Sequence, residues 1–205
     1  MLPRLYAIAD AAFGDPVEIA RRLFAGGVRL VQVRSKVPAS GLLLAQCRAV
    51  VTAAPPGARV IVNDRADIAR IAHAAGLHVG QGDLPPALAR VIIGDDPILG
   101  LSTHDEQQVR DAAGEPIDYI AVGPVFPTQT KPDTAPALGL EGLARLVEIT
   151  THPIVAIGGI RLENAPDVIR AGASSVAVIS DLIGVADIER RARQFVASLA
   201  EDGSV

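Results

Sequence analysis

Short runs of apolar, mostly β-branched residues recur along the whole chain, and longer segments with helical spacing separate them. Most of these runs are almost continuously apolar, as expected of parallel strands that are covered on both faces. The pattern predicts strands at Leu5–Ala9, Val28–Arg34, Arg59–Val62, Leu77–Gly80, Ile98–Leu101, Tyr119–Val122, Ile154–Ile157 and Ser175–Ile179.

The segments between the predicted strands are typical of amphipathic helices. Residues 17–24 place apolar side chains on one stripe and charges on the other, and residues 187–199 do the same. Glycines that favour a helix C-cap follow three helical segments, and prolines stand near three expected helix starts. These are Gly26-Gly27, Ala75-Gly76 and Ala171-Gly172, with Pro16, Pro38 and Pro85.

Eight strand–helix units in 205 residues leave about 25 residues for each unit. This economy predicts an α/β fold, a compact (β/α)8 TIM barrel that forms a single domain over residues 1–205. An open doubly wound sheet is the alternative, although such sheets seldom sustain eight even repeats. The one long loop, Gly123–Ala137, contains four prolines and is expected to serve as a lid or a binding loop.

Composition narrows the class of partner. The net charge of −4 gives no overall attraction to nucleic acid or to an anionic membrane, so an anion site must be local. No segment longer than twelve residues lacks Asp, Glu, Lys or Arg, and the N-terminus carries no secretion signal. The single cysteine, Cys47, cannot form an intrachain disulfide. We therefore expect a cytoplasmic protein that acts on small molecules; the oligomeric state stays open.

The second predicted strand ends in a basic cluster. Its alternating side chains place Gln32, Arg34 and Lys36 on one face. Two cations that converge at the mouth of a barrel are costly unless an anion or carboxylates neutralise them. The pattern favours phosphate binding, and a structural ion pair with an inward acidic residue remains the alternative.

The third and fourth predicted strands end in acidic and amide side chains. Asn63 and Asp64 close one strand, and Asp83 follows the next. Taken singly, each is also a good cap for the helix that follows. Taken together, the two carboxylates would lie at neighbouring strand ends, and Mg²⁺ favours a pair of carboxylates with substrate phosphate and water. The sequence thus predicts an Mg²⁺ site at Asp64 and Asp83.

Ser102 ends the fifth predicted strand. Its hydroxyl is suited to bind a phosphate or a ring nitrogen, or to cap a helix expected at 104–113. His78 lies within the fourth strand, where a structural, hydrogen-bonded histidine is the favoured interpretation. The four histidines do not form a ligand set.

Three later segments are suited to bind phosphate. Thr128, Thr130 and Lys131 would form an anion receptor in the long loop, unless they are only a solvated polar segment. Gly158-Gly159 follows the seventh strand and Ile179-Ser180 ends the eighth, and barrel phosphate sites often use the backbone N–H groups of these two loops. Glycine would be needed because a Cβ atom would block the phosphate.

This set of motifs, from Leu5 to the last helix, resembles the thiamine phosphate synthase family of (β/α)8 enzymes. The resemblance rests on Q-x-R-x-K at 32–36, Val62-Asn63-Asp64, G-L-H-V-G-Q-x-D at 76–83, Gly100-Leu101-Ser102, G-P-V-F-P-T-x-T-K at 123–131 and Ile157-Gly158-Gly159-Ile160. The family often has Glu at the position of Ser35 and Thr at the position of Ala9. Ser35 should lie on the face opposite Arg34, whereas Ala9 leaves the shape of the pyrimidine pocket open.

The resemblance implies an enzyme, a transferase of thiamine biosynthesis, and assigns its site. In the reaction, diphosphate would depart from hydroxymethylpyrimidine diphosphate, and the thiazole nitrogen would capture the pyrimidine methyl cation that results. Hydroxymethylpyrimidine diphosphate would contact Gln32, Arg34, Lys36, Asn63, Ser102 and Lys131, of which Arg34, Lys36, Ser102 and Lys131 would be catalytic. Asp64 and Asp83 would bind Mg²⁺. Thiazole phosphate would contact Thr128, Gln129, Thr130, Gly159, Ile179 and Ser180.

Other functions on this fold are weighed against the synthase. A related thiazole tautomerase has a histidine where this chain has Pro124, and it lacks the paired carboxylates. A non-catalytic phosphate-ligand sensor would keep the double glycine but lose the metal pair or Lys131. A phosphosugar epimerase would need acid–base residues that the strand ends do not provide.

Overall fold

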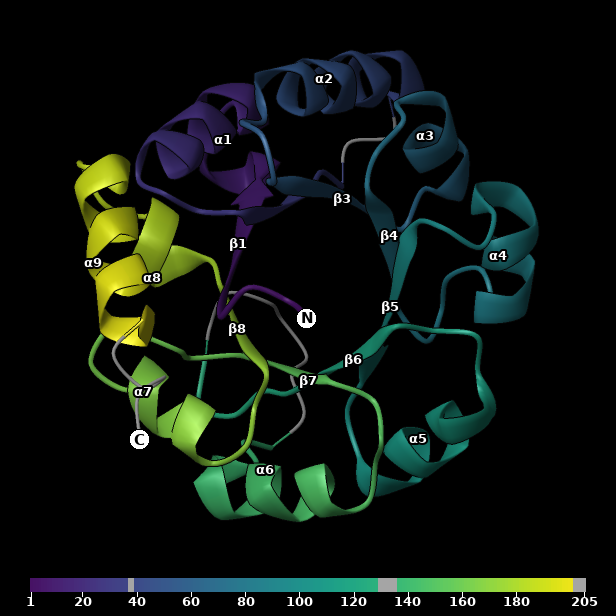
Figure 1. Cartoon of the computed structure of the whole chain (residues 1–205), viewed down its shortest axis with the longest axis vertical. Coiled ribbons are helices and arrows are strands. Elements are labelled where there is room, and N and C mark those ends of the chain that lie inside the picture. Colours follow the sequence, from purple (N-terminus) through teal and green to yellow (C-terminus); the bar gives the residue numbers. More distant parts are fainter. Residues whose placement is uncertain (37–38, 129–135, 201–205) are drawn as a thin grey trace.

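The computed structural model describes residues 1–36, 39–128 and 136–200. Within them, eight parallel strands pair in sequence order and β8 pairs back with β1, which closes the sheet into a barrel (Figure 1). The strands are β1 Leu5–Asp10, β2 Leu30–Arg34, β3 Arg59–Asn63, β4 Gly76–Val79, β5 Ile98–Thr103, β6 Tyr119–Val122, β7 Ile154–Ile157 and β8 Ser175–Val178. Closure confirms the predicted (β/α)8 barrel and rules out the open sheet, which would leave two unpaired edges.

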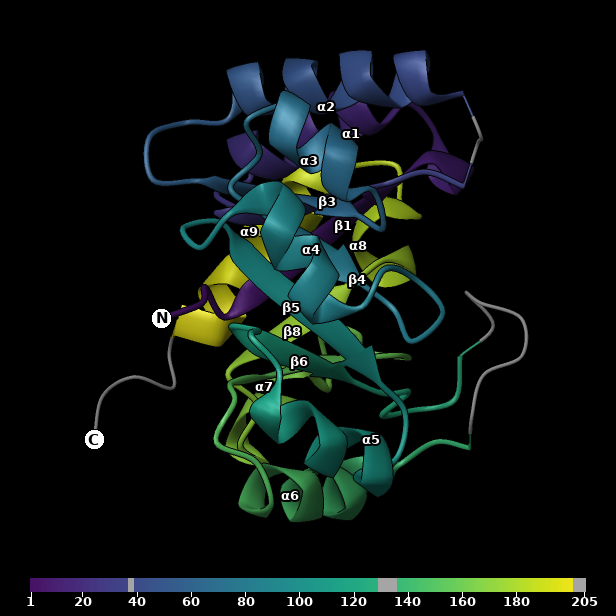
Figure 2. The same ribbon diagram turned by 90° about the vertical axis from the view of Figure 1, so that its right-hand side faces the viewer.

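The helices lie outside the ring and cover the outer face of the strands (Figures 1 and 2). They are α1 Pro16–Ala25, α2 Ser40–Ala53, α3 Ala66–Ile71, α4 Pro86–Ile93, α5 Glu106–Asp111, α6 Gly139–Glu148, α7 Ala165–Arg170, α8 Ser180–Ile183 and α9 Ile188–Ala200, with 3₁₀ helices η1 Ala11–Phe13 and η2 Ala112–Gly114. In the described part of the chain, none of them combines the length and apolar character that crossing a bilayer requires.

Burial on both faces explains the continuous apolar runs. Every residue of β1, β4, β6 and β8 is buried. Along β1, Tyr6 and Ile8 line the interior of the barrel at its pocket. Alternation then directs Leu5, Ala7 and Ala9 to the helix layer, so one side of the strand is buried in the barrel interior and the other against the helices.

Helix ends agree with the sequence less closely than strands do. Pro16 opens α1 and Gly26 follows its end, as predicted. Gly76, in contrast, is no helix cap: α3 ends at Ile71, and Gly76 starts β4, where a Cβ atom would lie 2.3 Å from the carbonyl oxygen of Ile98. The helix expected at 104–113 is also shorter, because Asp105 caps it and α5 begins at Glu106. Pro38 lies outside the described residues.

Candidate active site

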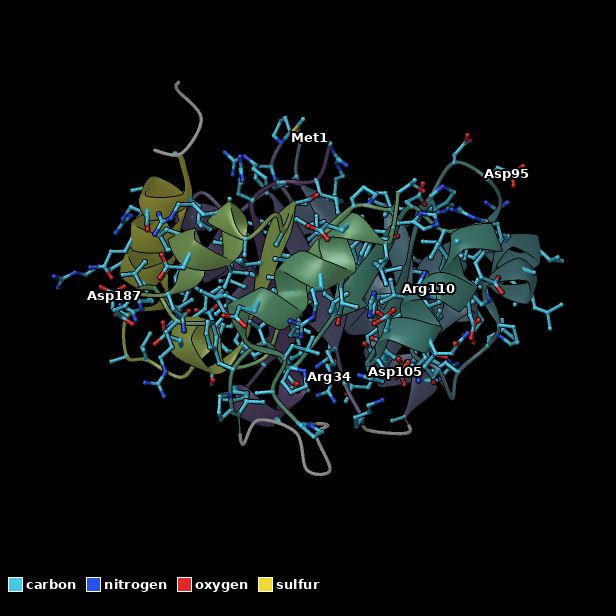
Figure 3. All side chains as sticks on the ribbon, turned by 90° about the horizontal axis from the view of Figure 1, so that it is seen from below. Met1, Arg34, Asp95, Asp105, Arg110 and Asp187 are labelled. Carbon is cyan, nitrogen blue, oxygen red and sulfur yellow. The ribbon has the colours of Figure 1, made fainter. Side chains whose placement is uncertain are left out.

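Predicted site residues from four neighbouring strands line one pocket of about 170 Å³ inside the C-terminal mouth of the barrel. These residues are Gln32, Arg34, Lys36, Asn63, Asp64, Asp83 and Ser102. Parallel strands all end on the same side, which is why side chains far apart in the sequence meet there. Figure 3 shows Arg34 and Asp105, which lie at and after strand ends, on the opposite side of the molecule from Met1 and Asp95.

Both cations of the basic cluster have carboxylate partners. Asp10, at the end of β1, pairs with Arg34, its register partner on β2. Lys36 Nζ lies 2.6 Å from Asp64 Oδ2. The structure therefore contains the ion pairs of the alternative interpretation, but both cations also face the pocket. An arginine carries five N–H donors, so a single carboxylate does not exhaust Arg34. Asp10 was missed by sequence reasoning, because only the strand register places it beside Arg34.

The two predicted metal ligands are held by the loops after β3 and β4. Asp64 has a left-handed backbone (φ 62°), and its N–H donates to the carbonyl oxygen of His78 at 2.8 Å. Asp83 Oδ2 accepts from the N–H of Gly80, also at 2.8 Å. Neither carboxylate caps a helix, because the N-cap residues of α3 and α4 are Arg65 and Pro85, with no side-chain cap bond at either. The capping interpretation of these residues is wrong.

The carboxylates influence one another. Partial burial raises the pKa of Asp83, the contact with Asp64 and its negative charge raise it further, and the Gly80 N–H and Lys36 oppose the shift. Two carboxylates that share one neighbouring lysine would be balanced by a divalent cation. No group of three or more His, Cys, Asp or Glu side chains with metal-binding geometry occurs among the described residues. A pair of carboxylates nevertheless fits Mg²⁺, which takes its other ligands from substrate phosphates and water.

A chain of hydrogen bonds crosses the barrel beneath these charges. Gln32 Nε2 donates to Tyr6 Oη at 2.8 Å, and the hydroxyls of Tyr6 and Tyr119 are 3.0 Å apart. His78 Nδ1 lies 2.9 Å from Tyr119 Oη, and His78 Nε2 lies 2.8 Å from Ser102 Oγ. His78 is thus the hydrogen-bonded histidine that the sequence favoured. Ser102 contacts His78 and does not cap α5, because Asp105 Oδ1 accepts from the N–H of Gln108 at 2.8 Å.

The tyrosines of this chain were not singled out from the sequence. Tyr119 enters the interior because residue 100 has no side chain; a Cβ atom at Gly100 would lie 2.0 Å from the Tyr119 ring. The rings of Tyr6 and Tyr119 meet edge to face, and His78 stacks on Tyr119 with 5.5 Å between ring centroids. Burial raises the pKa of Tyr6 and of Tyr119, which keeps both hydroxyls protonated. The sequence signal that could have indicated the interior position of Tyr119 was a glycine on β5, Gly100, opposite this tyrosine on β6.

The double glycine Gly158-Gly159 and the predicted residues Ile179 and Ser180, which follow β8, are not part of the pocket lining. Gly158 and Gly159 both have left-handed backbones (φ 98° and 64°). A Cβ atom at Gly159 would lie 2.7 Å from the carbonyl oxygen of Pro127. In the structure, close packing against the loop after β6 already requires glycine here, and a role in phosphate binding stays a prediction. Ile179 and Ser180 form the start of α8.

Part of the predicted thiazole phosphate site lies outside the residues that the structure describes. Thr128 is half-buried, at the edge of the described segment, and Gln129, Thr130 and Lys131 lie outside the described residues. The neighbouring loops are braced by contacts that sequence reasoning missed. Asp181 Oδ2 accepts from the N–H of Leu162 at 2.9 Å and from Arg191 at 2.6 Å.

Comparison with known proteins agrees with this geometry. Residues 5–182 match the family model described as thiamine monophosphate synthase. The chain is 44% identical over 202 residues to a thiamine-phosphate synthase of Koribacter versatilis, with 95% of each chain covered. It is 37% identical to a thiamine-phosphate synthase of Shouchella clausii, with 97% of each covered.

A solved structure extends the comparison to three dimensions. A thiamine phosphate pyrophosphorylase from Pyrococcus furiosus superposes with a TM-score of 0.90 at 31% sequence identity, and 98% of this chain and 97% of that chain are covered. Identity at this level over nearly the whole chain extends beyond a shared barrel. The chain therefore belongs to the thiamine monophosphate synthase family.

Proposed function

We propose that this protein is a thiamine phosphate synthase. It transfers the hydroxymethylpyrimidine group from its diphosphate to thiazole phosphate, and it releases diphosphate. One observation carries the proposal: two basic side chains, two interacting carboxylates, two amides and a hydroxyl from β2 to β5 line a single pocket at the barrel mouth. This combination suits a diphosphate bound through a divalent cation. The family relationship supports it.

The first step breaks the bond between the pyrimidine methylene carbon and the diphosphate oxygen, and the electron pair leaves with the diphosphate. Negative charge therefore develops on the diphosphate, where Arg34, Lys36 and, as predicted from the sequence, Lys131 would stabilise it. Asp64 and Asp83 would hold Mg²⁺, which when bound neutralises diphosphate oxygens. Gln32, Asn63 and Ser102 would orient the same substrate through an amide, an amide and a hydroxyl.

The second step joins the pyrimidine methylene cation to the thiazole nitrogen. That nitrogen carries a lone pair and no hydrogen, so the new carbon–nitrogen bond forms without a general base. In this scheme thiazole phosphate contacts Thr128, Gln129, Thr130, Gly159, Ile179 and Ser180. The tautomerase alternative is disfavoured because Pro124 stands where that enzyme has its histidine. Action on small phosphorylated molecules in the cytoplasm is part of the proposal.

Mixing the protein with hydroxymethylpyrimidine diphosphate and thiazole phosphate tests this function. We expect thiamine phosphate and diphosphate to form in equal amounts with Mg²⁺, and neither to form after Mg²⁺ is chelated. Omission of either substrate is the control for background hydrolysis. A folded sample that gives no thiamine phosphate with Mg²⁺ would overturn the proposal.

A further inference from the structure

Five side chains on five different strands link the interior of the barrel to the pocket. The hydrogen-bonded chain runs from Gln32 on β2 through Tyr6 on β1, Tyr119 on β6 and His78 on β4 to Ser102 on β5. The first four are buried, with exposed fractions of 7% or less. Ser102 is half-buried and borders the pocket. In such a dry setting each hydrogen must find an acceptor, so the chain has a direction.

Counting hydrogens gives that direction. The amide nitrogen of Gln32 only donates, so the Tyr6 oxygen accepts from it. The single Tyr6 hydroxyl hydrogen then points to Tyr119, and the Tyr119 hydrogen points to His78 Nδ1. Nδ1 is consequently an acceptor. A neutral imidazole has one N–H, which must lie on Nε2 and donate to Ser102 Oγ.

The reverse order does not fit the Gln32 contact. If Tyr119 donated to Tyr6, the Tyr6 oxygen would accept both from it and from Gln32. The Tyr6 hydroxyl hydrogen would then have no acceptor among the described residues, although the side chain is fully buried. Leaving a buried donor unsatisfied is unfavourable, because the group loses its hydrogen bond to water and gains none in return. Only an acceptor atom of residue 32 facing Tyr6, where Gln32 presents Nε2, would make the reverse order complete.

We propose that Gln32, through Tyr6 and Tyr119, holds His78 as the Nε2–H tautomer and so reserves the Ser102 hydroxyl hydrogen for the ligand. Ser102 already accepts from His78, so its own hydrogen points away from the chain. Tyr6, Tyr119 and His78 are positioning residues. On the proposed function, on which this step rests, the recipient is an acceptor atom of the pyrimidine diphosphate. Reversal would turn the Ser102 hydrogen toward His78 and leave only oxygen lone pairs facing that acceptor.

Nitrogen NMR of the ligand-free protein reports the direction of the hydrogen bonds independently of any enzymatic activity. In ¹⁵N-histidine-labelled protein near pH 8, we expect His78 to show a protonated Nε2 and an unprotonated Nδ1. A His78→Gln variant assigns its signals among the four histidines. A protonated Nδ1 with an unprotonated Nε2 would overturn the proposal.

Substitution of Gln32 tests whether that residue sets the order. An ionised Glu at position 32 only accepts, so near pH 8 Gln32→Glu should reverse the order of hydrogen bonds and move the His78 hydrogen from Nε2 to Nδ1. Ser175→Ala is the matched control: it removes another buried hydroxyl, which contacts the Arg4 carbonyl oxygen and lies outside the chain. The control should leave the tautomer unchanged. An unchanged tautomer in Gln32→Glu would refute the role of Gln32.

Kinetics connects the chain to Ser102. Tyr119→Phe keeps the ring and removes the hydroxyl, and we expect a fall in kcat of about tenfold with the KM for thiazole phosphate unchanged. Ser102→Ala should cost much less in the Tyr119→Phe background than in the wild type, because both remove the same oriented donor. Additive losses would contradict the coupling. If the wild type is inactive but shows the Nε2–H tautomer, the proposed synthase activity is refuted and the proposed order of hydrogen bonds is not.

Discussion

Asp10 fixes the position of a pocket arginine from the neighbouring strand. The side chains of Asp10 and Arg34 are 4% and 17% exposed, so the pair is largely withdrawn from water. Asp10 Oδ1 also accepts from the N–H of Ala12 at 3.0 Å at the start of η1. An amide at position 10 could keep that cap while losing the charge that balances Arg34, and an unbalanced buried charge is strongly destabilising.

We therefore expect Asp10→Asn to lower the free energy of unfolding by about 3 kcal/mol, as measured by urea denaturation. Asp15→Asn is the control, because Asp15 caps α1 through its own Oδ1 at an exposed position and asparagine caps equally well. That variant should stay within about 0.5 kcal/mol of the wild type. Equal effects in the two variants would show that the Arg34 pair adds nothing to stability.

The paired carboxylates lead to a metal prediction. Asp83→Asn removes one of the two proposed Mg²⁺ ligands, so the Mg²⁺ concentration for half-maximal thiamine phosphate formation should rise about tenfold or more. The barrel should remain folded, since Asp83 is exposed at the rim. Asp95→Asn, at an exposed position on the opposite side of the molecule, is the control (Figure 3). An unchanged Mg²⁺ requirement in Asp83→Asn would remove that residue from the metal site.

The raised pKa of Asp83 predicts a pH dependence. Without Mg²⁺, the Asp83 carboxylate binds a proton more tightly in the folded state than in the unfolded chain, where its pKa is near the ordinary 3.8. Its contribution to stability is then complete below 3.8 and is lost as the pH rises through the higher folded-state pKa. Urea midpoints measured across this range should fall with pH more steeply for the wild type than for Asp83→Asn. Parallel curves would contradict the shift.

Strands were predicted more closely than helices, for a physical reason. The apolar runs report burial on both faces, and every predicted strand overlaps an observed one with ends that differ by two residues or fewer. Helix ends depend on the backbone conformation of single residues, which the sequence pattern indicates poorly. The chain leaves α3 after Ala72 through His73, which takes the left-handed conformation (φ 53°) expected of a glycine. The glycine nearby, Gly76, serves strand packing instead.

Site residues were predictable by type and place, but their partners were not. Arg34, Asp64, Asp83 and Ser102 could be found because charged and polar side chains at strand ends stand out in an apolar chain. Their contacts come from register and curvature, which the sequence does not display. Tyr6 and Tyr119 share a hydrogen bond although they are 113 residues apart in the sequence, and each alone would be interpreted as an ordinary core aromatic residue.

The loops after β6 and β7 pack as one unit, and glycine makes this possible. The N–H of Phe126 donates to the carbonyl oxygen of Gly158 at 3.0 Å, and Gly159 touches the same loop. Gly159→Ala should therefore lower the free energy of unfolding by about 1–3 kcal/mol, through a left-handed alanine and a backbone clash. Gly41→Ala, in α2 with nothing within 4 Å, is the control and should be neutral or stabilising. A neutral Gly159→Ala would show that the two loops yield easily.

The barrel as a whole should respond to ligand as one cooperative body. A ligand that binds only the folded ring stabilises it in proportion to the logarithm of its concentration. Inorganic diphosphate with Mg²⁺, at about 100 times its Kd, should raise Tm by roughly 5–10 °C. Either component alone should give a clearly smaller shift, and Asp83→Asn should lose most of the combined effect. Equal shifts with and without Mg²⁺ would argue against a metal-bridged diphosphate.

Closure of the ring through β1 and β8 has a consequence for synthesis on the ribosome. β1 pairs with β2 on one side and with β8 on the other, so Ala7 faces Val31 and Val178 at once. At about 5–20 residues per second, roughly 10 to 30 s pass between the translation of Leu5 and that of Ser175. Throughout that interval one edge of β1, a strand that is buried along its whole length in the folded barrel, has no partner. The nascent barrel is therefore expected to need chaperones that shield open sheet edges.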